Sequence, residues 1–241
     1  MGSTIALMSG ACRGFAGFAA ADRREVDPSL AVIMMIIIFT ATMAGMDSQP
    51  SRKELSHERI VATAARAIRR GGFQGVGVAD IMKEAGLTHG GFYAHFSSRN
   101  ALLAEALERA GQDSAERVSQ ATAARQVRGA SALRALVEGY LSDRHLGDIE
   151  AGCPVAALAS EMPRQSPEVR ESSVQRVRGL IAAVRRALPK DAPADSGPAI
   201  ASQLVGALQL ARALGDNAEG RALLKASRRA LLAQYDRKPS D

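Results

Sequence analysis

The sequence predicts an all-α fold, and three observations favour it. Hydrophobic residues make up 46% of the 241-residue chain, but aromatic residues make up only 4% and tryptophan is absent. Alanine, leucine and arginine are abundant and form helices readily, whereas a sandwich or barrel would use more aromatic and β-branched residues. Apolar residues recur at helical spacing along the chain, and no segment shows the alternation typical of a half-buried strand.

Three short helices are expected first. The earliest, over residues 56–70, has Ser56 as its expected N-cap and ends at a pair of glycines. The second spans residues 78–85 and ends at Gly86. The third follows over residues 88–96 and turns two phenylalanines inward, which completes a small three-helix module.

About six further helices are expected to form a larger bundle. Gly129 is expected to break the first of them, and Pro154 suits the first position of a short helix. The expected helices cover residues 98–127, 133–141, 154–162, 177–188, 200–211 and 223–231.

The charge of the chain suits a polyanionic partner. The net charge of +6 belongs to residues 47–241, because the charges within residues 1–46 cancel. Residues 47–99 carry eight basic and five acidic side chains. Such a balance is typical of nucleic-acid binding without proving it. The two cysteines, Cys12 and Cys153, are too few and too distant for a disulfide framework or a zinc site, so a cytoplasmic location is expected.

The first 45 residues differ from the rest. Residues 30–46 form an uncharged, mostly apolar run of 17 residues, shorter than the roughly 20 residues that cross a membrane comfortably. Acidic residues also lie among the arginines that precede this run. We interpret residues 1–45 as an over-extended start or a hydrophobic leader, with the working protein beginning at Met46 or Met43. A membrane anchor at residues 30–46 and a secretory signal are the alternatives.

The most informative segment is GLTHGGFYAHFSSR, residues 86–99. It follows the amphipathic run at residues 78–85. Two short helices joined by a glycine-led turn, the second carrying Thr, His and Tyr side chains, are typical of a helix-turn-helix that places its second helix in the DNA major groove.

This arrangement resembles the TetR family of bacterial transcriptional regulators, most strongly over residues 58–107. Residues 58–65 look like the first helix of the family, and residues 72–88 look like its second helix and turn. Residues 90–103 look like its recognition helix and the start of its fourth helix. A further stretch, residues 208–214, resembles a C-terminal segment of one branch.

Two residues depart from the family pattern. Gly77 stands where the family usually has Thr or Ser, so a hydroxyl that could reach a phosphate is missing. Arg99 stands where the family usually has Lys, which keeps the positive charge.

The resemblance implies a DNA-binding domain at residues 56–98, preceded by a basic arm at residues 46–55. The glycines of the recognition helix allow close approach to DNA, and its tyrosine is expected to contact the backbone. The expected DNA-binding residues are Thr88, His89, Gly90, Gly91, Tyr93, His95, Arg99, Arg52 and Lys53. Each of these residues also has a structural alternative. Thr88 could be a helix cap, the glycines could provide loop flexibility, and Tyr93 could be a half-buried ring packed on Phe96. His95 and Arg99 could be solvated side chains, and the arm could be a disordered tail. Arg66, Arg69 and Arg70 are interpreted as a solvated helix end.

The resemblance also implies a ligand-binding and dimerisation domain at residues 99–236. The candidate ligand-binding residues are Tyr140, His145, Cys153, Met162 and Gln209, with core packing as the alternative for each. Cys153 lies at the expected start of a short helix, a position that favours thiol reactivity. A thiol-responsive or electrophile-responsive regulator switched at Cys153 therefore remains an alternative, beside a small buried side chain without chemistry.

The function implied by the resemblance is repression by a homodimer. The last two long helices would join the protomers, and small residues would let those helices approach closely. These are Ala201, Gly206, Ala207 and Ala211. Two-fold symmetry predicts a palindromic DNA operator with half-sites about one helical turn or a little more apart. A small-molecule effector would release the DNA by binding the two states of the protein with different affinity.

Other classes of function have less support. We find no nucleophile paired with a base, no phosphate-binding loop after a strand and no metal-ligand spacing, so neither an enzyme nor a cofactor is expected. His89 and His95 are six residues apart and do not share a helix face as metal ligands four residues apart would. A membrane-tethered regulator that uses residues 30–46 is the remaining alternative.

Overall fold

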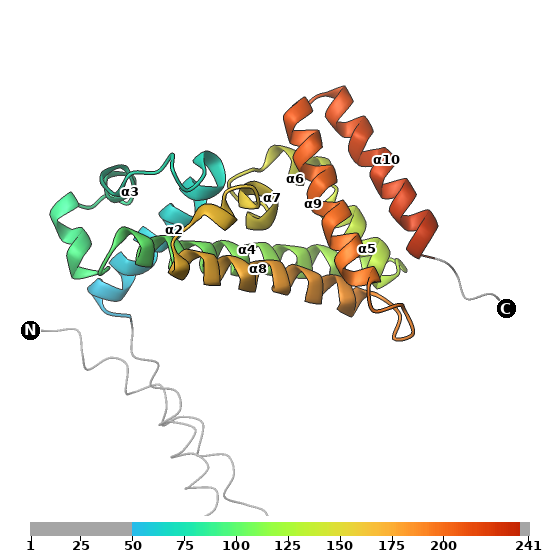
Figure 1. The fold of residues 1–241 in the computed structure, drawn as a ribbon, viewed down its shortest axis with the longest axis horizontal. Helices are drawn as coiled ribbons and strands as arrows, with labels where there is room; N and C mark the ends of the chain where they lie inside the picture. Colours follow the sequence, from blue (N-terminus) through green and yellow to red (C-terminus); the bar gives the residue numbers. More distant parts are fainter. Residues whose placement is uncertain (1–49, 237–241) are drawn as a thin grey trace, which may run out of the picture. The chain divides into compact units, whose positions relative to one another are not determined.

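A computed structural model describes residues 50–236, and all of its regular structure within this range is helical (Figure 1). This confirms the all-α prediction. The elements are α2 (Arg52–Gly71), α3 (Val78–Glu84), the 3-10 helix η1 (His89–Ala94), α4 (Arg99–Gln126), α5 (Ala132–Tyr140), α6 (Asp143–Gly147), α7 (Pro154–Leu158), the 3-10 helix η2 (Met162–Arg164), α8 (Pro167–Ala187), α9 (Ser196–Leu214) and α10 (Ala218–Tyr235).

The interpretations of residues 1–45, of a membrane anchor at residues 30–46 and of Cys12 lie outside the described residues. Between residues 50 and 236, none of the helices is both long enough and apolar enough to cross a membrane.

The three-helix module forms as expected around a continuous apolar core. α2 packs on α3 and along α4, and η1 packs on α3. The core residues of the module that are almost completely buried are Ile60, Ile68, Phe73, Ile81, Met82, Phe92, Phe96, Leu102 and Leu103. Gly86, with a φ of 72°, lets the chain reverse between α3 and η1 in a conformation that residues with a side chain rarely adopt.

The first helix begins earlier than predicted. Ser51, not Ser56, is the N-cap, since its hydroxyl accepts a hydrogen bond from the Glu54 amide at 3.2 Å. The Glu54 carboxylate accepts one in return from the Ser51 amide at 2.6 Å. This capping box starts the helix one turn upstream. Arg52 and Lys53 therefore lie in the first turn of α2, and the prediction that they belong to an arm is wrong.

The third helix is a 3-10 helix rather than an α-helix. Gly90 and Gly91 lower the helix propensity at its start, and short 3-10 turns are common where an α-helix cannot be sustained. Thr88 occupies the N-cap position of η1, but its side chain makes no capping hydrogen bond. The interpretation of Thr88 as the N-cap of this helix is therefore confirmed for its position, but its hydroxyl does not close the cap.

The C-terminal bundle is built on two long helices that run side by side, α4 and α8 (Figure 1). α4 begins after Ser98, whose hydroxyl accepts from the Ala101 amide at 3.0 Å, and ends close to the predicted residue 127. Gly129, with a φ of 86°, interrupts the helical conformation between α4 and α5 as predicted. α9 and α10 pack against each other as an antiparallel pair at the end of the bundle.

Three details of the bundle differ from the prediction. α8 starts at Pro167, ten residues before the predicted start, because Pro is well suited to the first turn of a helix. α6 was not predicted. The helix expected over residues 154–162 divides, with α7 starting at Pro154 as predicted and Met162 falling in η2, beside Pro163.

Most of the small residues of α9 face the core of the same chain. Ala201, Ala207 and Ala211 are buried there, whereas Gly206 is half-buried and no atom lies within 4 Å of where its Cβ would be. The prediction that these residues form a close-approach surface toward a second protomer is therefore wrong for the three alanines, which let α9 pack within its own bundle, and stays a prediction for Gly206.

Arg69 links the module to the bundle and is 3% exposed. Its guanidinium donates to the carbonyls of Ala110 in α4 at 3.4 Å and of Gly152 at 3.3 Å. It also pairs with Asp113 at 3.3 Å. Its neighbours Arg66 and Arg70 are exposed as predicted, but a solvated position is wrong for Arg69.

Replacing Arg69 tests how much this contact contributes to the free energy of unfolding. We expect Arg69→Met to lower the free energy of unfolding by about 2–4 kcal/mol, because it leaves two buried carbonyls without their donor and Asp113 paired with Arg109 alone. Arg66→Met, which removes an exposed pair with Glu84 at 3.8 Å, is the control and should cost under about 1 kcal/mol. Urea unfolding of both variants measures the difference, and equal costs would contradict a structural role for Arg69.

Candidate nucleic-acid interface and ligand pocket

The turn before η1 and the outer face of η1 bring the predicted recognition residues to the surface together. Thr88, His89, Gly90 and Tyr93 are exposed, and Gly91 is half-buried near Met82 of α3. No atom lies within 4 Å of where a Cβ on Gly90 would be, so the backbone there is open to close approach. The segment presents hydroxyl, imidazole and phenol groups on a rigid base formed by α2 and α3.

Tyr93 projects into solvent. Its side chain is 74% exposed, and its ring touches only the edge of Phe92, with ring centroids 5.2 Å apart. The alternative of a half-buried ring packed on Phe96 is therefore wrong. A phenol held at this position is available for a contact with an external partner.

His95 lies at the edge of a small aromatic cluster. Its ring is 6.0 Å from that of His57, which stacks on Phe96 at 4.6 Å and hydrogen-bonds to Glu105 at 2.7 Å. Burial, and then the nearby His57 and Lys53, lower the pKa of His95. These surroundings favour the neutral imidazole of His95 in the chain by itself.

Arg99 has a structural role that sequence reasoning missed. Its guanidinium donates to the carbonyl of Phe73 and, at 3.1 Å, to that of Val76. These carbonyls lie in the turn between α2 and α3, so Arg99 holds that turn to the start of α4. The other predicted charged contacts, Arg52 and Lys53, are exposed at the start of α2.

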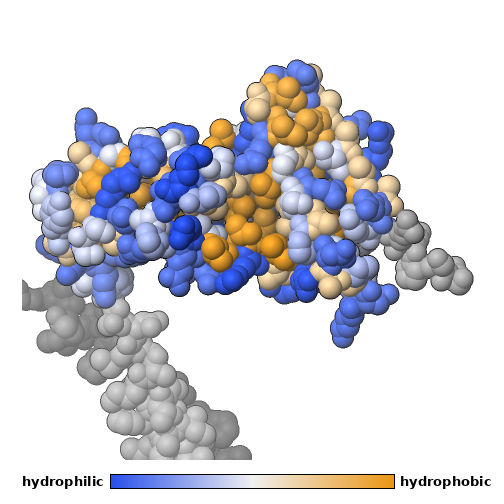
Figure 2. Space-filling view, viewed as in Figure 1, coloured by the Kyte–Doolittle hydropathy of each residue, from blue (hydrophilic) through white to orange (hydrophobic). Residues whose placement is uncertain are grey.

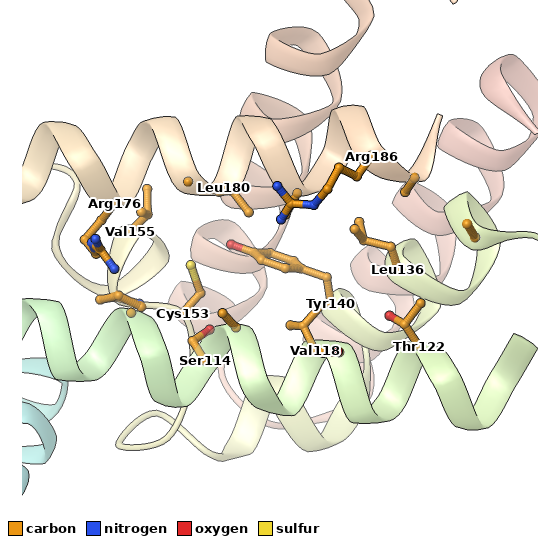
Figure 3. A pocket seen from close by; sticks show the side chains of 18 of the residues that line it. Ser114, Val118, Thr122, Leu136, Tyr140, Cys153, Val155, Arg176, Leu180 and Arg186 are labelled. Carbon is orange, nitrogen blue, oxygen red and sulfur yellow. The ribbon is translucent and has the colours of Figure 1, made fainter. Parts of the chain in front are cut away.

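A cavity of about 540 Å³ lies in the bundle between α4, α5, α7 and α8 (Figure 3). Tyr140 and Cys153, two of the predicted ligand-binding residues, line it. Both are almost completely buried, at 2% and 5% exposure. Cys153 occupies the N-cap position of α7 without a side-chain capping bond, so its thiol forms part of the cavity wall.

The remaining predicted ligand-binding residues do not line this cavity. Met162 is buried in the core, and Gln209 is half-buried on α9. His145 lies behind the wall, where its Nε2 accepts from the Cys153 amide at 2.9 Å and its Nδ1 contacts the Tyr140 carbonyl at 2.6 Å. The prediction that these three side chains share a cavity with Tyr140 is wrong, because the helices carry them to other faces.

The cavity wall is connected to the three-helix module through the peptide at Gly152–Cys153. Gly152, whose carbonyl accepts from Arg69, directly precedes Cys153. A Cβ on Gly152 would lie 2.7 Å from Nη2 of Arg212 and 2.9 Å from Nε2 of His145, so only glycine fits. A second connection runs from Glu161, whose carboxylate accepts from the Phe73 amide at 2.9 Å. Residues 50–236 contain no cluster of three or more His, Cys, Asp or Glu side chains that could hold a metal ion.

Comparison with known proteins gives two matching family models. Residues 60–106 match "Bacterial regulatory proteins, tetR family", and residues 129–226 match "Tetracyclin repressor-like, C-terminal domain". An uncharacterised HTH-type transcriptional regulator of Mycobacterium tuberculosis is 29% identical over 170 residues, which cover 66% of this chain and 85% of the relative. The HTH-type transcriptional repressor NemR of Escherichia coli is 25% identical over 133 residues, which cover 55% and 67%.

Solved structures share the fold. The crystal structure of a TetR transcriptional regulator from Chloroflexus aurantiacus superposes with a TM-score of 0.60 at 22% identity, covering 76% of this chain and 97% of that one. The sequence relatives are named as transcriptional regulators, which points away from an enzyme.

His145 makes stability depend on pH. Burial lowers its pKa from 6.5 to about 4, so between these values the unfolded chain binds a proton that the folded protein does not. The free energy of unfolding should therefore fall as the pH drops from about 6.5 to about 4, by up to about 3 kcal/mol from this residue. His145→Asn should flatten the curve over that range, while the exposed control His89→Asn should leave its slope unchanged. Parallel curves for wild type and His145→Asn in urea unfolding would contradict the assignment.

Proposed function

The chain belongs to the TetR family of bacterial transcriptional regulators, and on that basis we propose that it is a repressor whose homodimer occupies a palindromic DNA operator until a small molecule releases it. The observation that carries this proposal is the pairing of an exposed recognition segment with a partly enclosed cavity in one chain. The Gly152–Cys153 peptide is one direct connection between the two, because Arg69 holds its carbonyl side and Cys153 lines the cavity.

DNA binding is assigned to the exposed residues of the turn and of η1. Thr88, His89 and Tyr93 offer hydrogen-bond donors and acceptors for base edges and phosphates, and Gly90 and Gly91 let the backbone approach. Arg52 and Lys53 at the start of α2 add positive charge for phosphates. Arg99 serves this interface by holding the turn between α2 and α3, with any phosphate contact secondary to that role.

Dimerisation is assigned to the outer faces of α9 and α10. Leu210 is 60% exposed and Leu214, one turn later, is 37% exposed. Figure 2 shows apolar surface at the end of the bundle that these two helices form. An apolar surface of this kind is a typical interface feature. Exposed alanines on α10 would allow close packing, at Ala222, Ala226, Ala230 and Ala233.

Release from DNA requires that the ligand-bound cavity favour a different arrangement of the two DNA-binding modules. A ligand shifts such an equilibrium only as far as its affinities for the two states differ. Contact with the Cys153 wall would displace Gly152 and hence Arg69, which is anchored in α2. Movement of α2 would carry α3 and η1 with it and change the separation of the recognition segments.

A thiol-responsive regulator is the second candidate. The observation that favours it is the place of Cys153 in the cavity wall, next to the peptide that Arg69 holds. Modification of the thiol would enlarge the side chain and press on the same peptide. A Cys153→Ser protein that still responds to its inducer would exclude this candidate.

Removal of the Tyr93 hydroxyl tests the DNA interface. Tyr93→Phe should weaken binding to DNA from the region upstream of its gene about tenfold, because a hydrogen bond to a charged phosphate is lost. Since Tyr93 is exposed, the unfolding midpoint should not change. Fluorescence anisotropy across a salt series measures the affinity, with DNA selected from a random pool as the ligand if the upstream region is not bound. Tyr235→Phe, the same change at the end of α10, is the control, and equal affinities of the two variants would count against the Tyr93 contact.

A charge on α9 tests the dimer. Leu210→Lys should convert the dimer to a monomer, because a charge in an apolar interface is costly to desolvate. DNA affinity should fall at the same time, since linking two half-site contacts raises the affinity. Sedimentation velocity gives the mass. Ile149→Lys, at a side chain 41% exposed between α6 and α7, is the control. A Leu210→Lys dimer of unchanged stability would place the interface elsewhere.

A further inference from the structure

The bundle cavity is long and narrow and owes its existence to small side chains. Its lining on α4 runs from Gly111 to Gln126, a distance of about 22 Å along the helix axis. Alanine and serine recur on this face, and Gly179, Ala183 and Ala187 face it from α8. Protein interiors are otherwise close-packed, so a cavity of this length between two parallel-running helices suits an elongated ligand with an apolar body.

The charged groups of the cavity are of one sign. Arg176 and Arg186 of α8 line it, and no aspartate or glutamate does (Figure 3). Neither arginine makes an ion pair with a residue in the described range 50–236. Most other arginines that approach the core of the bundle are paired or hydrogen-bonded, as Arg69 is. The cavity therefore holds positive charge without a counter-charge from the described part of the chain.

Arg176 is placed inside the cavity by a glycine on the opposite helix. A Cβ on Gly111 of α4 would lie 2.6 Å from Nη1 of Arg176, so a larger residue would push the guanidinium out. The Nε of Arg176 is buried and has no hydrogen-bond partner among the described residues. Buried donors without a partner are uncommon in native proteins, which makes this one a candidate for contact with a bound molecule.

Tyr140 supplies an independent indication of a ligand. Its side chain is 2% exposed, and its hydroxyl meets no strong hydrogen-bond partner among residues 50–236, since its polar neighbour, the Cys153 thiol, is only a weak acceptor. The hydroxyl points into the cavity, between the sides from which Arg176 and Arg186 enter (Figure 3). Burial raises the pKa of Tyr140 well above its usual value, so the group keeps its proton and acts as a donor. The two buried groups of the cavity that lack a strong partner, on Tyr140 and Arg176, are therefore both donors.

We propose that this cavity binds an organic anion with an elongated apolar body, whose carboxylate accepts hydrogen bonds from the Tyr140 hydroxyl and the Arg176 guanidinium. Arg186, which is exposed at the rim, adds longer-range attraction that water and salt weaken. A cation would be repelled by both arginines, and a neutral molecule would leave their charge without a counterpart. This assignment rests on the proposed function, because it names the class of effector that the repressor would sense.

Matched ligands that differ only in the head group test the class. The full-length protein would be titrated by calorimetry with octanoate beside octanol, and with naphthoate beside naphthalenemethanol. We expect the carboxylate of at least one pair to bind about tenfold more tightly than the alcohol with the same skeleton. Alcohols that bind as tightly as the carboxylates, or an absence of binding by both carboxylates, would overturn the proposal.

Variants locate the head group. Arg176→Met should lower carboxylate affinity about tenfold and leave alcohol affinity unchanged, and Tyr140→Phe should lower it severalfold. Arg186→Met should have a smaller effect. Arg178→Met, on the same helix but outside the cavity lining, is the matched control. Unfolding midpoints identify any variant that has lost its structure. If Arg176→Met has lost its structure, Arg176→Lys is measured in place of Arg176→Met. Carboxylate binding that is indifferent to both Arg176 and Tyr140 would overturn the assignment.

DNA binding is measured separately, so that the two proposals can fail separately. If the carboxylate binds through Arg176 but DNA affinity does not change, the ligand class holds and effector release is wrong. If DNA is bound selectively but no carboxylate binds the cavity, the repressor assignment holds and the ligand class is wrong. Retained carboxylate binding by Cys153→Ser would separate this site from a thiol switch.

Discussion

The buried guanidinium of Arg69 is the interaction on which the arrangement of the described residues depends. It belongs to α2, yet it donates to the carbonyls of Ala110 in α4 and of Gly152 before α7, and it pairs with Asp113. A buried charge must be paired and hydrogen-bonded, and the planar fork of arginine accepts few geometries. Three segments distant in sequence are therefore held in one orientation by a polar contact within an apolar core. That orientation sets where η1 stands relative to the bundle.

The same contact is the route by which, in the proposed function, a ligand in the bundle cavity would influence the DNA-binding surface. The Gly152 carbonyl contacts Arg69, and the next residue, Cys153, forms part of the cavity wall. No side chain fits at Gly152, because His145 and Arg212 fill the space around it. Because protein interiors are close-packed, the proposed function expects a shift of the wall to pass to α2. The guanidinium of Arg69 has hydrogen-bond partners within the chain and stabilises the fold. The Tyr140 hydroxyl and Arg176 Nε lack a strong hydrogen-bond partner among the described residues, so they remain able to donate to a bound molecule.

Much of the fold could be predicted from local pattern. The limits of α4, the start of α7 at Pro154 and the breaks at Gly86 and Gly129 follow from apolar periodicity and from the preferences of proline and glycine. The capping box at Ser51 is also present in the sequence as Ser-x-x-Glu, a local signal that agrees with the start of α2 at Arg52. The replacement of an α-helix by the 3-10 helix η1 was harder to foresee, because helix propensity only weakly decides between the two forms.

The sequence alone determined the class of fold, the helix-turn-helix and the exposed recognition residues, because these depend on interactions within a few residues along the chain. The tertiary structure decided the rest. The sequence indicated a solvated helix end for Arg69, but its side chain is buried and bonds to two other segments. The sequence indicated a phosphate contact for Arg99, but its guanidinium bonds to the turn between α2 and α3. The cavity residues Arg176, Arg186 and Gly111 carried no signal of their own, because a cavity exists only where α4 and α8 face each other. Which side chains meet across helices depends on packing between distant segments, and no local pattern encodes it.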